Sequence, residues 1–175
     1  MTLTLLLGGA RSGKSTLAKR RAEALGLPVV FVATAEARDA EMSDRIARHR
    51  AERPATWSTL EVPCDLDEAI DRVPAEAAVI VDCLTLWVAN LMERGDDAIE
   101  TAADAAARRA ARRSAPVIAV SNEVGMGIVP DHTLGRAYRD RLGRVNAIWA
   151  RRAQETLLVV AGRTLTLQPE GPFDG

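Results

Sequence analysis

Short apolar runs alternate along the chain with longer segments in which apolar residues recur every three or four positions. The short runs are typical of β-strands buried on both faces, and the longer segments are typical of helices. The sequence predicts strands over residues 3–7, 29–33, 57–62, 79–81, 117–120 and 157–160, with an edge strand over 165–167. It predicts helices over residues 15–25, 39–53, 66–72, 84–94, 98–113 and 132–154. This alternation predicts an α/β fold with a mainly parallel central sheet flanked by helices.

Length and composition are those of one globular domain. The chain has 175 residues, of which 47% are hydrophobic and 27% are charged. These values exclude a disordered chain and a disulfide scaffold. We therefore expect a single domain over residues 1–175, with a loose tail over residues 168–175, where two Pro and two Gly occur.

Charge and hydropathy narrow the range of partners. The chain carries 23 basic and 24 acidic residues, a net charge of −1, and only 3% aromatic residues. This balance does not indicate a nucleic-acid partner, and the few aromatic side chains argue against a base-stacking platform. No apolar run approaches the roughly 18 residues of a membrane span, and we expect no signal peptide before the first predicted strand. Cys64 and Cys83 lack C-x-x-C spacing, and we expect a reduced, cytoplasmic protein.

A glycine-rich segment follows the first predicted strand and matches the phosphate-binding pattern G-x-x-x-x-G-K-[ST]. Its residues are Gly8, Gly9, Ala10, Arg11, Ser12, Gly13, Lys14 and Ser15. The motif requires a strand before it and a helix after it, and both are predicted here. Loop N–H groups and the helix N-terminus would bind phosphate oxygens. Lys14 would reach the β- and γ-phosphates, and the Ser15 hydroxyl would bind Mg²⁺.

A second acidic group on the metal side is expected at the end of a neighbouring strand. The apolar run over residues 77–81 ends in Asp82. This is a Walker B pattern, in which the carboxylate holds Mg²⁺. Any buried strand can end in Asp, so the pattern gains its meaning from the phosphate loop.

The predicted helix over residues 39–53 carries His49 among four arginines, namely Arg45, Arg48, Arg50 and Arg53. At helical spacing, Arg45 and Arg53 would share one face with His49. The arginines could hold a polyphosphate, and a neutral imidazole could act as a nucleophile. By themselves, these residues are more typical of a solvated basic helix with an incidental histidine.

Taken with further segments, these motifs resemble a known enzyme family. The segments are Ala33-Thr34, R-x-x-x-H-R-x-x-R-P through His49, D-C-L-T from Asp82, S-N-E-V-G-M-G-I-V-P from Ser121, and G-R-V-N from Gly143. From Leu3 to about Leu167, the chain is similar to the bifunctional adenosylcobinamide kinase/adenosylcobinamide-phosphate guanylyltransferase family of cobalamin biosynthesis. Two positions depart from the family: Ala147, where Gln is frequent, and Asp82, where some members carry Glu.

The resemblance implies a P-loop NTPase fold of the RecA-like type, a homotrimer and two reactions. The first phosphorylates adenosylcobinamide with ATP or GTP, with Lys14 as a catalytic residue. In the second, His49 takes GMP from GTP as a phosphoramidate and passes it to adenosylcobinamide phosphate. The resemblance further implies GTP contacts at Ala33, Thr34, Ala35, Ala51, Glu52, Arg53, Pro54, Glu61 and Asp82. It gives His132 no role, and we interpret that residue as a helix start.

Two other functions remain compatible with the motifs. One is a small-molecule P-loop kinase in which His49 is incidental. The other is a nucleotide-dependent switch or ATPase subunit. The segment Asn122–Pro130 follows a predicted strand, where ligands bind in open α/β folds, but it could equally form a tight turn or a subunit contact.

Overall fold

A computed structural model describes residues 3–37 and 39–169 of the chain. In the predicted tail, residues 170–175 lie outside the described part, and Gln168 and Pro169 have no regular structure. The strands are β1 (Leu3–Leu7), β2 (Val29–Ala33), β3 (Ser58–Glu61), β4 (Ala78–Asp82), β5 (Val117–Val120), β6 (Glu155–Val160) and β7 (Arg163–Leu167). The helices are α1 (Lys14–Ala24), α2 (Ala40–Ala51), α3 (Leu66–Arg72), α4 (Leu84–Asn90), α5 (Asp96–Arg112) and α6 (Thr133–Arg152), with a 3₁₀ turn η1 (Met92–Arg94).

The strands form one sheet in the order β3-β2-β4-β5-β1-β6-β7. Every neighbouring pair is parallel except β6 and β7, which form an antiparallel hairpin. The predicted mainly parallel sheet is therefore confirmed. The central strands β1, β2, β4 and β5 are buried along almost their whole length, whereas β3 and β7 are mostly exposed, as edge strands are.

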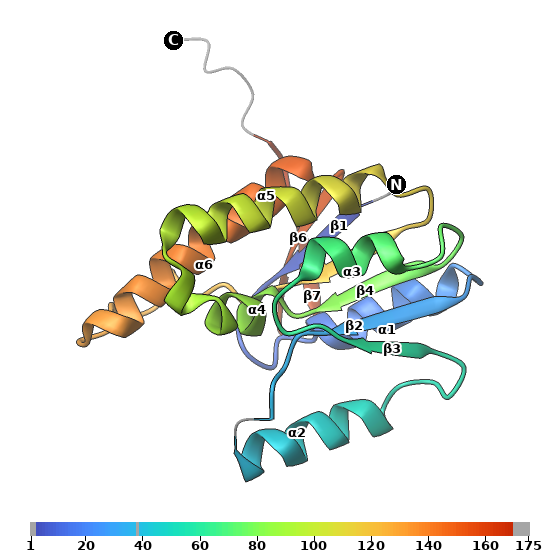
Figure 1. Cartoon of the computed structure of the whole chain (residues 1–175), viewed down its shortest axis with the longest axis horizontal. Helices are drawn as coiled ribbons and strands as arrows, with labels where there is room; N and C mark the ends of the chain where they lie inside the picture. The colour runs from blue at the N-terminus through green and yellow to red at the C-terminus, as the bar shows by residue number, and fades with distance from the viewer. Residues whose placement is uncertain (1–2, 38, 170–175) are drawn as a thin grey trace.

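Successive side chains of the sheet enter two separate apolar layers, because a strand points alternate residues to opposite faces. One layer packs Leu5, Val79 and Val81 against α3, α4, α5 and α6. The other packs Leu6 and Ile80 against α1. Figure 1 shows this arrangement, with α2 set apart from the body of the domain beyond β3.

One predicted helix is divided in two, and the others differ from the observed helices by at most two residues at either end. The segment predicted as one helix over residues 84–94 is divided into α4 and η1. Leu91, at the junction, has φ −93° and ψ 0°, outside the helical region, and the next turn closes with the tighter bond from the Arg94 N–H to the Leu91 carbonyl. The helix predicted over residues 39–53 is shorter at its C-terminal end and stops at Ala51. Its N-terminal boundary is set by Asp39, whose carboxylate accepts the Met42 N–H at 2.7 Å.

A substitution at Ile80 tests how much the central packing contributes to stability, because this β4 side chain packs toward α1 and is only 1% exposed. We expect Ile80→Ala to lower the free energy of unfolding by about 2–5 kcal/mol. The matched control is Leu165→Ala on the edge strand β7, since Leu165 is 61% exposed and should lose much less. Urea denaturation of both variants tests this, and similar losses at the two positions would contradict the assigned core.

Candidate active site

The carboxyl ends of four parallel strands meet at one edge of the sheet. The order of the strands places β5 between β1, which leads into the phosphate loop, and β4, which ends in Asp82. β2 lies on the other side of β4 and leads toward α2. Residues from four separate segments of the chain are therefore gathered around one site.

The phosphate loop adopts a backbone that only a few residue types permit. Gly8 has φ 151° and Gly13 has φ 103°, so both lie where a side chain would be strained. Gly13 is the residue before α1, and it offers no side chain to bind the first N–H groups of the helix. Those N–H groups and the positive end of the helix dipole are consequently available to an anion.

Lys14 folds back over this loop. Its ammonium group donates hydrogen bonds to the carbonyl oxygens of Gly8 at 2.9 Å and Gly9 at 2.7 Å, and it contacts the Ser12 hydroxyl at 3.3 Å. The side chain is buried. Burial lowers the pKa of Lys14, while the nearby acidic groups of Cys83 and Asp82 oppose that shift. The cation is thus held at the mouth of the loop.

Asp82 lies beside Ser15, as the two motifs predict. Burial raises the pKa of Asp82, and a hydrogen bond with the Ser15 hydroxyl is the largest effect in the opposite direction. The positive charges of His49, Arg53 and Lys14 also lower it, in that order. The structure therefore brings Lys14, Ser15 and Asp82 together, with His49 and Arg53 near enough to act electrostatically on the carboxylate.

Thr34 joins the end of β2 to the chain that follows Asp82. Its hydroxyl donates to the Cys83 carbonyl at 2.7 Å and accepts the Cys83 N–H at 2.9 Å, across a cis Asp82–Cys83 peptide bond. The side chain is fully buried, between the buried Ala33 and the half-buried Ala35. Burial also raises the pKa of the Cys83 thiol to about 11, so it stays protonated at neutral pH and is a poor nucleophile.

His49 lies on α2 with its side chain exposed, as do Arg48 and Arg50. The side chain of Arg45 lies outside the described part of the structure. The exposed ring is accessible to a phosphate ester.

The prediction that Arg53 shares the face of α2 with His49 is wrong, because the helix ends at Ala51. The chain turns inward there, and the Arg53 guanidinium lies 3.7 Å from the centroid of the Phe31 ring. It donates to the Thr59 hydroxyl at 3.2 Å, and its Nε has no partner among the described residues. Burial lowers the pKa of Arg53, with Asp82 opposing the shift.

A small cleft of about 250 Å³ opens beside Arg53. Arg50, Pro54 and Trp57 contribute to its walls. The remaining predicted contact residues lie around it on the surface. Ala51 and Glu52 are exposed, with Glu52 paired to Lys19 at 3.1 Å, and Glu61 is paired to Arg50 at 3.6 Å.

Two contacts of the phosphate loop were not predicted from the sequence. The Gly162 N–H, in the turn between β6 and β7, donates to the Ser12 carbonyl at 2.9 Å. The Glu123 N–H, after β5, donates to the Gly8 carbonyl at 3.1 Å. For the contact of Gly162, the sequence offered one indication, namely a short turn at Ala161 and Gly162 between two predicted strands. His132 is a helix start as interpreted, since its Nδ1 accepts the Gly135 N–H at 2.9 Å.

The oxygen ligands at the site suit Mg²⁺ rather than a transition metal. Among the described residues, no group of three or more His, Cys, Asp or Glu could enclose a metal ion. Mg²⁺ that is bound together with a nucleotide needs only one or two protein oxygens, because phosphate and water supply the rest. The Ser15 hydroxyl and the Asp82 carboxylate fit that requirement.

A strand, a phosphate loop and a helix, with a carboxylate on a nearby parallel strand, define a P-loop nucleotide-binding protein. Solved structures show the same fold. The flagellar accessory protein FlaH from Methanocaldococcus jannaschii is 15% identical, with a TM-score of 0.52 over 93% of this chain and 74% of its own. The RadB recombinase is 20% identical, with a TM-score of 0.50 over 90% of this chain and 73% of its own.

Within that class, the chain belongs to the cobinamide kinase / cobinamide phosphate guanyltransferase family, whose profile matches residues 4–167. The bifunctional adenosylcobalamin biosynthesis protein CobP of Pseudomonas aeruginosa is 44% identical over 95% of this chain and 97% of its own length. CobU of Escherichia coli is 42% identical over 91% and 96%, respectively. The resemblance found in the sequence motifs is confirmed. Over residues 3–37 and 39–169, every helix is too short or too polar to span a bilayer.

The buried carboxylate of Asp82 should lower the free energy of unfolding of the protein at neutral pH. Because burial raises its pKa, the folded protein disfavours the charged carboxylate more than the unfolded chain does. We expect Asp82→Asn to raise the unfolding temperature at pH 7. This gain should shrink as the pH falls and vanish below about pH 4, where aspartate is protonated in both states.

The control is Asp96→Asn on the protein surface. Hydrogen bonds from Arg144 and Arg141 lower the pKa of Asp96, so that variant should gain nothing at pH 7. Thermal melts from pH 7 downward test the pair. An Asp82→Asn protein no more stable than wild type at pH 7 would contradict the burial effect.

Proposed function

We propose that this protein phosphorylates adenosylcobinamide with ATP or GTP and then transfers GMP from GTP to the product. Its output is adenosylcobinamide-GDP, an intermediate in the formation of cobalamin. The observation that carries the proposal is the phosphate loop, in which Lys14 bonds to the carbonyls of Gly8 and Gly9 beside the paired Ser15 and Asp82, in a chain that exposes His49 on α2. The descriptions of the family and of CobP support both reactions.

In the kinase reaction, Lys14 neutralises negative charge on the transferred γ-phosphoryl group. The hydroxyl of the aminopropanol arm attacks that phosphorus, its proton leaves, and the bond to the β-phosphate oxygen breaks. The N–H groups of the phosphate loop hold the phosphate chain in place. Phosphoryl transfer depends mostly on positioning and charge neutralisation, which these groups provide.

In the transfer reaction, an imidazole nitrogen of His49 attacks the α-phosphorus of GTP, and pyrophosphate leaves. The resulting phosphoramidate carries GMP. A terminal phosphate oxygen of adenosylcobinamide phosphate then attacks the same phosphorus, the P–N bond breaks, and His49 is restored. Arg53 lines the smaller cleft, where its guanidinium group could pair with a phosphate oxygen.

We further propose that Ser15 and Asp82 hold Mg²⁺, which would offset negative charge on the phosphates when bound. The GTP contacts implied at residues 33–35 and 51–54, and at Glu61, are part of the same proposal. Pro54 and Arg53 have the most direct support, because both line the cleft beside Phe31. The buried Thr34 hydroxyl is occupied by Cys83, so we assign it to positioning that segment.

The two reactions should separate in a reciprocal pair of variants. We expect His49→Ala to lose the GMP adduct and guanylyl transfer while keeping substantial kinase activity, because only the α-phosphorus reaction needs an imidazole. We expect Lys14→Ala to lose at least about a hundredfold in kinase rate, since charge on the transferred group is no longer neutralised. Mass spectrometry of the intact protein after GTP and Mg²⁺, with a corrinoid phosphorylation assay, measures both.

His132→Ala is the matched control, and it should keep the adduct and both activities. An adduct retained on His49→Ala, or mapped to His132 in the wild type, would return His49 to an incidental position. Full kinase activity of Lys14→Ala would remove the phosphate loop from the mechanism.

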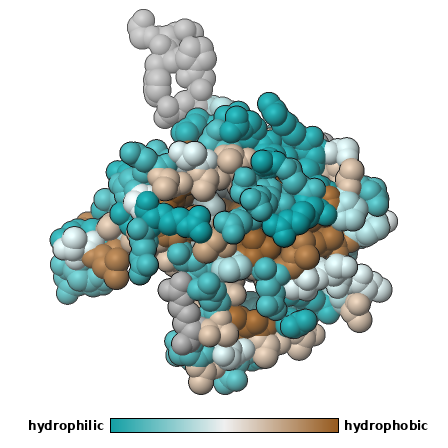
Figure 2. All heavy atoms as spheres, viewed as in Figure 1, coloured by the Kyte–Doolittle hydropathy of each residue, from teal (hydrophilic) through white to brown (hydrophobic). Residues whose placement is uncertain are grey.

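We also propose a cytoplasmic homotrimer. The loop before α6 and the start of that helix expose large apolar side chains: Met126 (79%), Ile128 (96%), Val129 (57%) and Leu134 (67%). In Figure 2, hydrophobic atoms appear at this protruding end of the molecule. An exposed apolar patch of this kind is typical of a contact surface.

Light scattering should give three times the mass of one chain for the wild type. We expect Ile128→Asp to dissociate that assembly, because the substitution buries a charge in an apolar contact. Arg20→Asp, an exposed substitution on α1, serves as the surface-charge control and should leave the mass unchanged. A monomeric wild type, or an Ile128→Asp protein with unchanged mass, would contradict this contact.

A further inference from the structure

A second and larger cleft lies outside the groups assigned so far. Its volume is about 500 Å³, and it opens between the loop that follows β5 and one side of α6. Glu123 and Gly125 form the loop wall, and Arg139, Asp140 and Gly143 form much of the helix wall. This volume falls within the range of small-molecule sites, about 300–1,000 Å³.

The cleft adjoins the phosphate loop directly. The Glu123 N–H donates to the Gly8 carbonyl at 3.1 Å, and the same carbonyl accepts from the Lys14 ammonium at 2.9 Å. A molecule in the cleft would therefore lie next to the group that neutralises the transferred phosphate. The smaller cleft beside Arg53 lies farther along the sheet edge, beyond β4 and β2.

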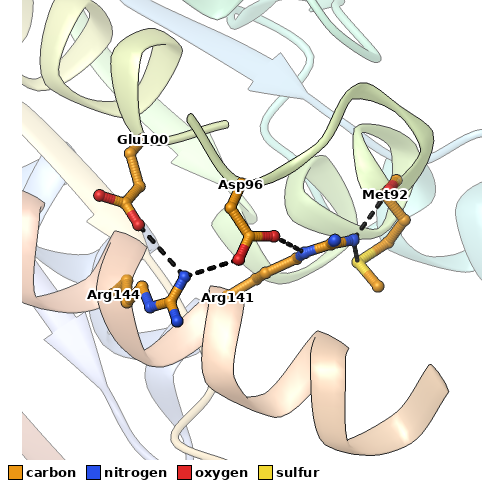
Figure 3. Close-up of polar contacts among 5 residues, drawn as sticks. All are labelled: Met92, Asp96, Glu100, Arg141 and Arg144. Atoms are coloured by element: carbon orange, nitrogen blue, oxygen red, sulfur yellow. Dashed lines mark hydrogen bonds and ion pairs between the residues drawn. The ribbon is translucent and has the colours of Figure 1, made fainter. Parts of the chain in front are cut away.

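Both walls of the cleft are held in place. The buried Asn146 side chain accepts the Ser121 hydroxyl at 2.6 Å and donates to the Asn122 carbonyl at 3.0 Å, which ties α6 to the loop. Figure 3 shows the other attachment, in which Arg141 and Arg144 of α6 contact Asp96 at 2.6 and 2.8 Å. The cleft is therefore preformed by the fold.

The side chains in the cleft suit a ligand that is rich in amides. Glu123 accepts the N–H groups of Gly125 and Met126, and Arg139 donates to Asp140. A carboxylate has further lone pairs and a guanidinium has further N–H groups, and these can bind amide N–H groups and amide carbonyls. Gly143 leaves the helix surface open, because a Cβ built there would meet nothing within 4 Å. The corrinoid acceptor carries primary amides around its ring and one hydroxyl at the end of an arm.

We propose that this cleft receives the hydroxyl-bearing arm and the adjoining amide edge of the corrinoid acceptor. The inference rests on the proposed function and assigns its acceptor to one place in the fold. The nucleotide then approaches from the Arg53 side and the corrinoid from the α6 side, with Lys14 between them. The rest of the macrocycle stays outside the cleft, which is open to solvent.

The test is Gly143→Leu, which places a bulky side chain in the cleft at an exposed helical position. We expect the KM for adenosylcobinamide to rise at least about tenfold at saturating ATP, because the acceptor loses space that it needs. The GMP adduct formed with GTP alone should be unchanged, since that step needs no corrinoid. Gly143→Ala should give a smaller rise, and Ala24→Leu, on exposed α1 surface, should give none.

Asp140→Lys provides a second variant whose folding is not at risk, because that residue is exposed. It should also raise the corrinoid KM and leave the adduct intact. An unchanged KM in both variants would overturn the proposal, and so would loss of the adduct or a changed assembly mass in Gly143→Leu. A wild-type protein that fails to phosphorylate adenosylcobinamide would instead contradict the proposed function itself.

Discussion

A buried cation and a buried carboxylate at one edge of the sheet determine how this site is built. Burial lowers the pKa of Lys14 and raises that of Asp82, so each group would be costly to keep charged on its own. Each lowers that cost for the other through its opposite charge. The carbonyls of Gly8 and Gly9 hold the cation, and the Ser15 hydroxyl meets the carboxylate. The surrounding strands must keep these groups at fixed positions relative to one another.

These positions are set by hydrogen bonds between loops that are distant in sequence. The Thr34 hydroxyl connects the end of β2 to Cys83, because it donates to the Cys83 carbonyl and accepts the Cys83 N–H. The Glu123 and Gly162 N–H groups bind carbonyls of the phosphate loop from the β5 and β6–β7 sides. Because these bonds lie at the carboxyl edge of parallel strands, they fix the position of the loop without occupying the N–H groups at the start of α1.

The proposed nucleotide side and the proposed acceptor side of the site differ in how firmly the fold holds them. On the first, α2 lies apart from the body of the domain and carries the exposed His49, while Arg53 is fixed against Phe31 (Figure 1). On the second, α6 is tied to both α5 and the loop after β5. An exposed His49 and a fixed α6 suit the proposed use of one phosphate loop for reactions at two phosphorus atoms.

The sequence alone determined the features that depend on local pattern. The apolar runs predicted the strands. The sequence also predicted the phosphate loop before α1 and the position of Asp82 at the end of a strand, because each of these features is formed by contiguous residues. Only the tertiary structure decided that Arg53 leaves the face of His49 to stack on Phe31, that η1 follows a break at Leu91, and that a cleft opens along α6. Those features arise from contacts between segments far apart in the chain, and hydrophobic periodicity carries no information about which distant side chains meet.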